Sequence, residues 1–176
     1  MTTDLGLARG IDAQSFGQPG QRTFRLRVVG SGGEFASLWM EKQQLQVLNL
    51  ALAQILAQVR YEGAPTPAAI NEFPEAARHE FRVGRMAVGF DSSGRSIVIC
   101  AFDTEAGDED EPVLCLRVGL GTGADVRQQL GEIIAAGRPV CPLCHMPVDA
   151  SSHQCVRTNG HSRQPPPAED LADEDE

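Results

Sequence analysis

The hydrophobic pattern of the chain changes its period near residue 41, and this change narrows the range of possible folds. Between Thr23 and Val28 apolar residues alternate with arginines, as in a strand with one buried face. Residues 35–40 follow a glycine-rich turn and are predicted to form the hairpin partner of that strand. From residue 41 to 60 one apolar stripe recurs at helical spacing: Leu45, Leu48, Leu52, Ile55, Leu56 and Val59. The sequence therefore predicts a helix packed on a β-sheet.

The second half of the chain follows the same order of strands and then a helix. Residues 81–102 are predicted as a second hairpin, whose returning strand is apolar on both faces and therefore central in the sheet. Residues 112–120 are predicted as another strand, followed by a helix with Thr122 as its N-cap. No strand is predicted before residue 17, and the two blocks share no residues that would indicate a duplication. The order β-β-α-β-β-β-α predicts an α+β fold, in which two helices pack on one side of an antiparallel sheet.

Three regions are predicted along the chain: an α+β domain at 15–139, a zinc-binding element at 140–162 and a disordered acidic tail at 163–176. With 176 residues, 41% of them hydrophobic, the chain can form the core of one domain without cross-links. The tail has three consecutive prolines followed by acidic residues, a composition that does not form a packed core.

The zinc-binding element holds three of the five cysteines and three of the four histidines of the chain. Two cysteines separated by two residues can bind one ion from a tight turn, and a second pair of ligands further along completes a tetrahedral site. We predict one Zn²⁺ with four protein ligands: Cys141, Cys144, His153 and Cys155. His161 is the alternative fourth ligand, whereas His145 would require a distorted turn after the second cysteine. A closed set of four ligands leaves no position for water, so the zinc is predicted to be structural.

The formal net charge of −9 arises from two acidic runs, with six acids within 103–111 and six within 169–176. Outside these runs 12 acidic residues are present with 15 basic ones, a small basic excess for a nucleic-acid-binding protein. The single tryptophan and single tyrosine also offer few surfaces for base stacking. Nucleic acid is therefore not expected as a partner.

Targeting signals and membrane spans are not predicted. The longest apolar segment, residues 48–57, is too short to cross a bilayer, and the first ten residues lack a basic stretch followed by an apolar run. We expect a cytoplasmic protein without membrane association. In a reducing cytoplasm five cysteines favour metal binding and thiols over disulfides, so Cys100 and Cys115 are predicted to be thiols in the core.

Several separated motifs resemble a bacterial family of domains of unknown function, of actinobacterial type. They are Gly17–Phe24, Glu41–Gln44, Phe81–Gly84 and Ala136–Pro139, the last leading into Cys-Pro-Leu-Cys and then Arg157-x-Asn-Gly. The resemblance covers about residues 15–161 and implies a zinc-ribbon-like site with a His-x-Cys pair at His153, but no reaction. This chain has other residues at four positions where the family motif has Gly or Pro, which implies looser turns around the metal: His145, Ala150, Ser152 and Val156.

Two further patterns have both a functional and a structural interpretation. Residues 119–123, Gly-Leu-Gly-Thr-Gly, could bind phosphate at a helix start, but the spacing differs from Gly-x-Gly-x-x-Gly and a plain strand-to-helix turn explains it. Glu41–Gln44, with Arg22, could form an active site around Lys42, the only lysine. The favoured interpretation is that these polar residues cap the helix and hold the preceding hairpin. Trp39 is predicted to lie in the core.

These observations predict a non-enzymatic adaptor or regulatory protein that binds a protein partner. The contact would involve the zinc-binding element and five conspicuous polar residues: Arg22, Gln43, Gln44, Arg157 and Asn159. Two alternatives remain open. One is a hydrolase or transferase acting on an anionic substrate, with Lys42 and Glu41 involved; the other is nucleic-acid binding through Arg157 and Asn159. Convergence of Arg22, Glu41, Lys42 and Gln44 in a pocket would favour the enzyme.

Overall fold

The computed structural model describes residues 1–107, 109–137, 141 and 143–144. The chain divides into two compact units, residues 1–137 and 138–176, and the described helices and strands all belong to the first. In chain order the elements of the described residues are β1 (Thr3–Leu7), β2 (Gly10–Phe16), β3 (Thr23–Val29), β4 (Phe35–Met40), α1 (Lys42–Gln58), β5 (His79–Asp91), β6 (Ser96–Asp103), β7 (Leu114–Gly119) and α2 (Leu120–Ala135).

The strands form one mixed sheet in the order β1-β7-β6-β5-β4-β3-β2. The pairs β1–β7 and β4–β5 are parallel, and the other neighbouring pairs are antiparallel. The prediction of an α+β fold with two helices is confirmed, and β6 is central in the sheet as expected. The prediction of a purely antiparallel sheet is wrong, because the helical connection α1 returns the chain to start β5 in the direction of β4.

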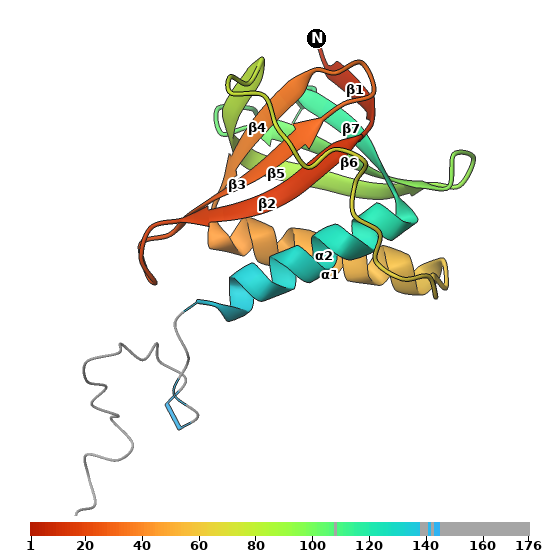
Figure 1. Ribbon diagram of the computed structural model, residues 1–176. Helices are drawn as coiled ribbons and strands as arrows, with labels where there is room; N and C mark the ends of the chain where they lie inside the picture. The colour runs from red at the N-terminus through yellow and green to blue at the C-terminus, as the bar shows by residue number, and fades with distance from the viewer. Residues whose placement is uncertain (108, 138–140, 142, 145–176) are drawn as a thin grey trace, which may run out of the picture. The chain divides into compact units, whose positions relative to one another are not determined.

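The segment 3–16 joins the two edges of this sheet, although it was not predicted to contain strands. The backbone N–H of Ala8 donates to Arg117 of β7 at 2.8 Å, and the next N–H, of Arg9, donates to Val29 of β3 at 2.8 Å. Within two residues the chain thus changes its partner from one end of the strand order to the other. The sheet in Figure 1 is accordingly curled, with β1 and β2 closing it.

Strand β5 changes partner in the same way. Residues 79–82 pair in parallel with β4, and from Val83 onwards the strand pairs antiparallel with β6. The series formed by segment 3–16, β3, β4 and α1 therefore has the same topology as the series formed by β5, β6, β7 and α2. The same arrangement of strands and helix therefore occurs two times in the structure, although the two stretches of sequence share no matching residues.

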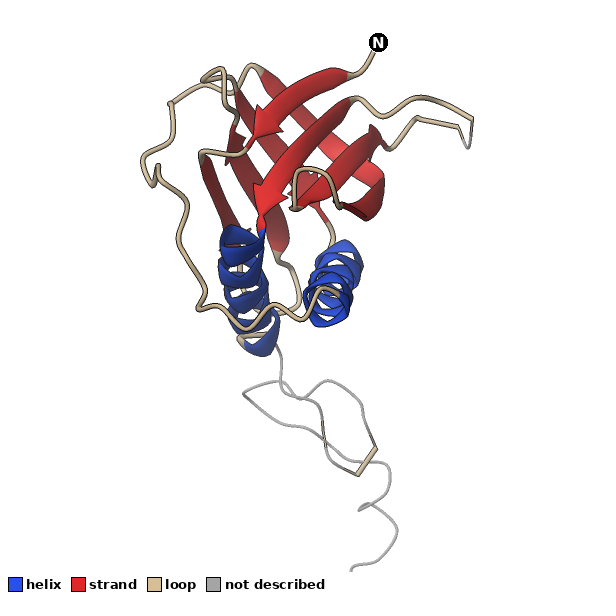
Figure 2. Cartoon of the chain, turned by 90° about the vertical axis from the view of Figure 1, so that its right-hand side faces the viewer, coloured by secondary structure: helices blue, strands red, loops and turns tan. Residues whose placement is uncertain are grey.

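The core lies between the curled sheet and the two helices, which cover the same side of it (Figure 2). The predicted inward faces are confirmed for the apolar residues of β3 and for four residues of the helical stripe: Leu45, Leu48, Leu52 and Ile55. Leu56 and Val59 of that stripe are half-buried, and Val59 follows the end of α1. The alternating Arg25 and Arg27 lie on the other face of β3. The fully buried residues include Leu26, Leu38, Leu48, Leu52, Leu116 and Leu130. Each contributes roughly 1.5–3 kcal/mol through removal from water.

Two local features differ from the sequence predictions. Helix α2 begins at Leu120 with Gly119 as its N-cap, so Thr122 lies inside the first turn. Strand β2 was missed because its inward positions include Ala13, a small residue, so the apolar alternation is weak. The edge of β2 is instead held by α2: Gln129 Oε1 accepts the N–H of Ala13 at 3.1 Å, and its Nε2 donates to Asp125 at 2.8 Å.

Cys100 and Cys115 oppose each other in the β6–β7 register and form a disulfide. Both are half-buried, whereas their neighbours Ile99 and Leu116 are buried in the core. The prediction that the two cysteines are core thiols is therefore wrong in this structure. Because β6 is apolar on both faces, its sequence alone did not indicate which face carries the cysteine.

Neither helix within the described part of the chain combines the length and the apolar character that a membrane-spanning segment requires.

Candidate functional site

Strands β2 to β5 present a row of polar and aromatic side chains on the face of the sheet that points away from the helices. Gln14, Arg25, Trp39 and Arg82 oppose one another in register on successive strands. Opposed residues of neighbouring strands share a face of the sheet, so the four lie side by side. Trp39 is half-buried on this outer face, and its indole N–H donates to Glu80 at 2.7 Å. The prediction that Trp39 lies in the core is wrong, because its neighbours Leu38 and Met40 occupy the inward positions.

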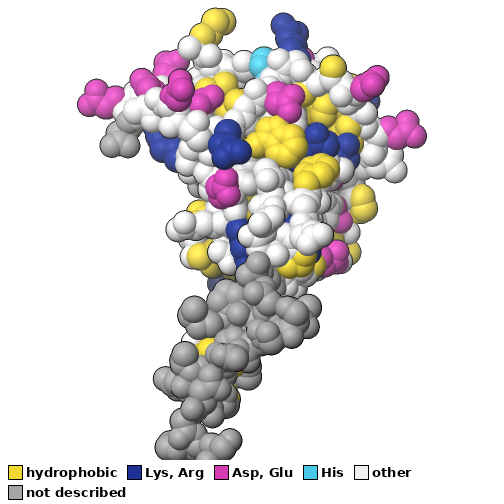
Figure 3. All heavy atoms as spheres, turned by 90° about the vertical axis from the view of Figure 1, so that its left-hand side faces the viewer, with side chains coloured by type: hydrophobic (Ala, Val, Ile, Leu, Met, Phe, Trp, Pro, Cys, Tyr) yellow, Lys and Arg dark blue, Asp and Glu magenta, His cyan; other side chains and the backbone are white. Residues whose placement is uncertain are grey.

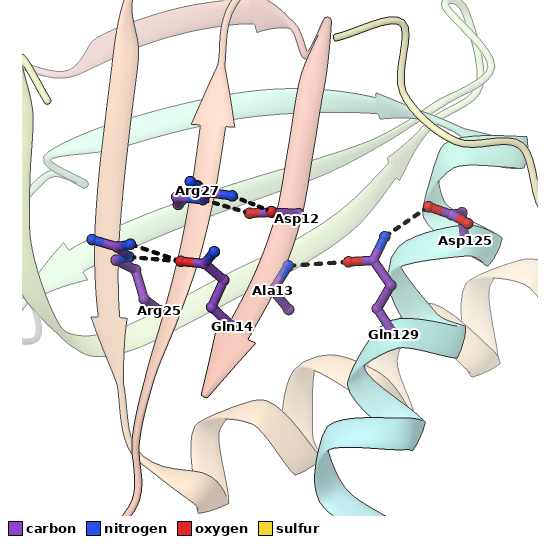
Figure 4. Close-up of polar contacts among 7 residues, drawn as sticks. All are labelled: Asp12, Ala13, Gln14, Arg25, Arg27, Asp125 and Gln129. Carbon is purple, nitrogen blue, oxygen red and sulfur yellow. Dashed lines mark hydrogen bonds and ion pairs between the residues drawn. The ribbon is translucent and has the colours of Figure 1, made fainter. Parts of the chain in front are cut away.

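Arg25 contacts two aromatic rings that also lie next to each other. Its guanidinium carbon is 4.9 Å from the centroid of Phe16 and 5.1 Å from that of Trp39, and the two rings are 5.7 Å apart. Its Nε and Nη2 donate to Oε1 of Gln14 at 3.2 and 2.7 Å (Figure 4). The charge of Arg25 is therefore oriented by two cation–π contacts and a neutral amide. Phe16 is 41% exposed, which leaves one side of this arrangement accessible.

Arg27, two residues further along β3, forms a second contact of this kind. Its guanidinium carbon is 4.0 Å from the ring centroid of Phe73, and it forms a bidentate ion pair with Asp12. The hydrogen bond with Asp12 raises the pKa of Arg27, an effect that burial partly opposes. We define the arginine–aromatic face as Phe16, Arg25, Arg27, Trp39 and Phe73. Figure 3 shows hydrophobic side chains grouped with Lys and Arg side chains on one face of the molecule.

Sequence reasoning missed this face as a site. It placed Arg25 and Arg27 on the outward side of a strand correctly, but gave them no role. Phe16 precedes a turn in a segment with no predicted strand, and Phe73 lies in a proline-rich loop. A usable signal was present in the alternating arginines of β3, since a strand that carries arginines outward needs partners for them on the adjacent strands.

The polar residues at the start of α1 meet only in part. Gln44 Nε2 donates to the carbonyl oxygens of Val83 and Gly84 at 2.6 and 2.9 Å, and its Oε1 accepts the N–H of Glu41 at 2.9 Å. The Glu41 carboxylate accepts from Arg82 at 3.3 Å. The contact between Gln44 and Glu41 fits the predicted capping role. The hydrogen bonds to Val83, Gly84 and Arg82 are with β5, which follows the helix, and not with the preceding hairpin as predicted.

Among the described residues, no hydrogen bond or ion pair joins Lys42 or Arg22 to Glu41 or Gln44. A Cβ added to Gly137 would be 3.2 Å from Lys42 Nζ, so the ammonium lies at the C-terminal end of α2, where a cation interacts favourably with the helix dipole. Arg22 immediately precedes β3 and has a buried Nε without a partner among the described residues. Gln43 lines a shallow cavity of about 400 Å³ with Glu41, Gln44 and Arg85.

The glycines of residues 119–123 have a packing role in the described structure. Gly121 accepts the N–H of Thr66 at 2.9 Å through its carbonyl oxygen. A Cβ added to Gly123 would lie 2.5 Å from Ile97 Cδ1, so this glycine allows α2 to approach the sheet closely. This supports the plain structural interpretation of the motif.

The predicted zinc ligands are only partly within the described residues. Cys141 is buried at 6% exposure and Cys144 is half-buried, whereas His153 and Cys155, together with His145, Arg157, Asn159 and His161, lie outside the described residues. Among the side chains that the structure describes, no group of three or more His, Cys, Asp or Glu is placed to hold a metal ion. The predicted metal site stays a prediction.

Comparison with known proteins identifies the family of the chain. A family model described as "Protein of unknown function (DUF3090)" matches residues 8–155, most of the chain, and the protein belongs to this family. The matched range includes β2 to α2 and extends to Cys155, the last of the predicted zinc ligands. No curated protein matches the sequence.

Proposed function

We propose that this member of the DUF3090 family is a zinc-binding adaptor or regulatory protein without enzymatic activity, which binds a protein partner through the arginine–aromatic face. The observation that carries the proposal is the contact of the Arg25 guanidinium with both Phe16 and Trp39 on an open face of the sheet. Tryptophan and arginine are the side chains that most often dominate the binding energy of protein interfaces. A guanidinium already held by two rings and an amide loses little further conformational freedom on binding.

The second part of the proposal is one Zn²⁺ bound by Cys141, Cys144, His153 and Cys155, in a family of bacterial, actinobacterial type. It is supported by the Cys-x-x-Cys spacing and by the inclusion of all four residues in the range that matches the family model. The zinc would provide a rigid element, and Arg157 and Asn159 beside it would contribute to the partner contact. A cytoplasmic location is part of the proposal, as a compartment in which the thiolates of Cys141, Cys144 and Cys155 stay reduced. The Cys100–Cys115 disulfide would be unusual in that compartment.

An active site built on Lys42 and Glu41 is not proposed. The Lys42 ammonium lies at the end of α2, whereas the Glu41 carboxylate is paired with Arg82 of β5. The two side chains contact different elements, so they do not form a common site for an anionic substrate.

The partner proposal is tested by affinity capture from a lysate of the native host with the full chain as bait. We expect one protein to bind wild type and an Arg117→Ala control, in which the lost arginine lies on the exposed side of β7. Arg25→Ala and Trp39→Ala should each reduce its recovery about tenfold. Equal recovery by all four baits, or no specific protein with wild type, would contradict the proposal.

The zinc proposal is tested by elemental analysis of untagged protein. We expect one zinc per chain in wild type and in the double variant Cys100→Ser/Cys115→Ser, a control that replaces both cysteines outside the predicted ligands. Cys141→Ser and Cys155→Ser should lose the metal. Retention of the full amount of zinc in both would show that the ligands are elsewhere.

A further inference from the structure

A groove of about 420 Å³ runs between the two helices, and none of its lining residues belongs to the arginine–aromatic face. It is closed at one end by the turn that follows α1. Its lining residues come from three segments: Asn49 and Leu56 of α1, Tyr61, Gly63 and Pro65 of the turn, and Ala124, Arg127, Gln128 and Gly131 of α2. The contacts described above do not explain why this space remains open between the two helices.

Asn49 supplies the first indication of a ligand. Its Oδ1 atom is buried and has no hydrogen-bond partner among the described residues. Buried polar atoms in proteins are nearly always paired, and an unpaired acceptor opposes folding. Asparagine is also a poor residue for the interior of a helix, so helix propensity does not account for its presence in α1. A donor on a bound molecule would complete this pairing.

Arg127 supplies the second indication. It lies exposed on α2 and lines the same groove, and no hydrogen bond or ion pair joins it to another residue in the described part of the chain. The nearby Gln128 is already engaged, since its Nε2 donates to Glu132 at 3.1 Å. A single guanidinium that lines a groove and has no protein partner there matches a monoanion, and a carboxylate can accept two parallel hydrogen bonds from it.

The walls of the groove combine polar and apolar groups, and contacts within the turn fix one of them. Tyr61 donates its hydroxyl to Ala64 at 3.0 Å, which fixes the ring in the turn. A Cβ added to Gly63 would lie 2.4–2.9 Å from atoms of this ring, so only glycine lets the ring pack there. On the opposite wall a Cβ added to Gly131 would meet nothing within 4 Å, so the space beside α2 is open.

From these observations we infer that the groove binds a small carboxylic acid that carries a hydroxyl or amino donor and an apolar body. The carboxylate pairs with Arg127, the donor hydrogen-bonds to Asn49 Oδ1, and the apolar body lies against Leu56 and Tyr61. This site is independent of the proposed partner surface, because the two share no residue.

The test uses three probes of one size, with the dissociation constant of each measured by calorimetry on the full chain. They are 3-phenyllactate, 3-phenylpropionate, which lacks the hydroxyl, and 3-phenylpropane-1,2-diol, which lacks the carboxylate. We expect 3-phenyllactate to bind most tightly. Arg127→Gln should weaken it about tenfold without changing the affinity of the diol, since a hydrogen bond to a charged group contributes about that factor. Arg117→Gln, the control, should have no effect.

Asn49 is tested separately, because its replacement also changes the helix. Asn49→Ala should weaken 3-phenyllactate about fivefold to tenfold and leave 3-phenylpropionate unchanged, since only the former has the donor. Asn49→Leu should raise the melting temperature of the free protein, since it removes the unpaired acceptor. No binding of 3-phenyllactate to wild type at about 10 mM, a concentration that would reveal even millimolar affinity, would overturn the inference. An equal loss for all three probes in Arg127→Gln would also overturn it.

Discussion

Replacing Gln44 by alanine should destabilise the protein more than is usual for a half-buried side chain. Its carboxamide connects the start of α1 to the point where β5 changes partner, through hydrogen bonds to Val83, Gly84 and Glu41. A typical intramolecular hydrogen bond contributes about 0.5–1.5 kcal/mol, so three bonds give roughly 1.5–4.5 kcal/mol. We expect a loss of about 2–4 kcal/mol in the free energy of unfolding for Gln44→Ala.

Gln43→Ala is the matched control. Gln43 is the preceding residue of the same helix and is exposed, and both substitutions change helix propensity equally. The control should therefore alter the free energy of unfolding by less than about 0.5 kcal/mol. The difference between the two variants isolates the three hydrogen bonds of Gln44.

Urea denaturation followed by fluorescence measures this difference. Trp39 is the only tryptophan of the chain and lies on β4, within the unit that Gln44 stabilises, so its emission reports on that unit. The midpoint of Gln44→Ala should fall while the slope of the transition stays constant. Free energies of unfolding within about 0.5 kcal/mol of each other in Gln43→Ala and Gln44→Ala would refute the reasoning, since the carboxamide would then contribute no net stability.

Three further outcomes are expected. Gly84→Ala should lower the free energy of unfolding by about 1–3 kcal/mol, because the added Cβ would lie 2.6 Å from the backbone oxygen of Asp103. Gly131→Ala should raise the free energy of unfolding by about 0.5–1 kcal/mol, because the added Cβ in α2 would meet nothing within 4 Å. Urea denaturation of both variants measures the two effects. The hydrogen bond from the Ser93 hydroxyl is the main cause that lowers the pKa of Asp91. The ionised Asp91 carboxylate therefore stabilises the folded protein above about pH 4, and this stabilisation is lost as the pH falls through the lowered pKa. A ¹³C NMR titration should show this pKa rising in Ser93→Ala. Chelation of the zinc should leave most of the far-UV circular dichroism intact, because the described helices and strands lie within residues 1–137; complete unfolding would contradict this.

Periodicity predicted the elements that bury a continuous apolar stripe. The helix with Leu45, Leu48 and Leu52 and the strand with Leu26 were found because one face of each is almost entirely apolar. Strand β1 has a single buried apolar residue, Leu5, and β2 has Ala13 where a larger residue would signal a strand. Their positions depend on hydrogen bonds to distant strands, which leave no local pattern.

The candidate sites were predicted less well than the fold, for a related reason. Gln44 and Glu41 were singled out from their position at a helix start, and their contacts fit the capping role because capping is local. The contact of Arg25 with Phe16 and Trp39 depends on the register of three strands, and the groove at Asn49 depends on how two helices cross. Neither arrangement follows from the spacing of residues along the chain.

The change of partner at Ala8–Arg9 and again in β5 has a consequence for how the molecule could be divided. Residues 3–58 form one half and residues 79–135 the other, and each half pairs a segment of its own first strand with the last strand of the other half. In isolation each half would expose the strand edge that pairs with the other half in the whole protein. The unpaired backbone groups of that edge would make the isolated half prone to aggregation. The halves are thus complementary fragments, so a chain cut in the loop between them would still be held together by two parallel strand pairs. A dimer of a single ancestral half would have the same interlocked form.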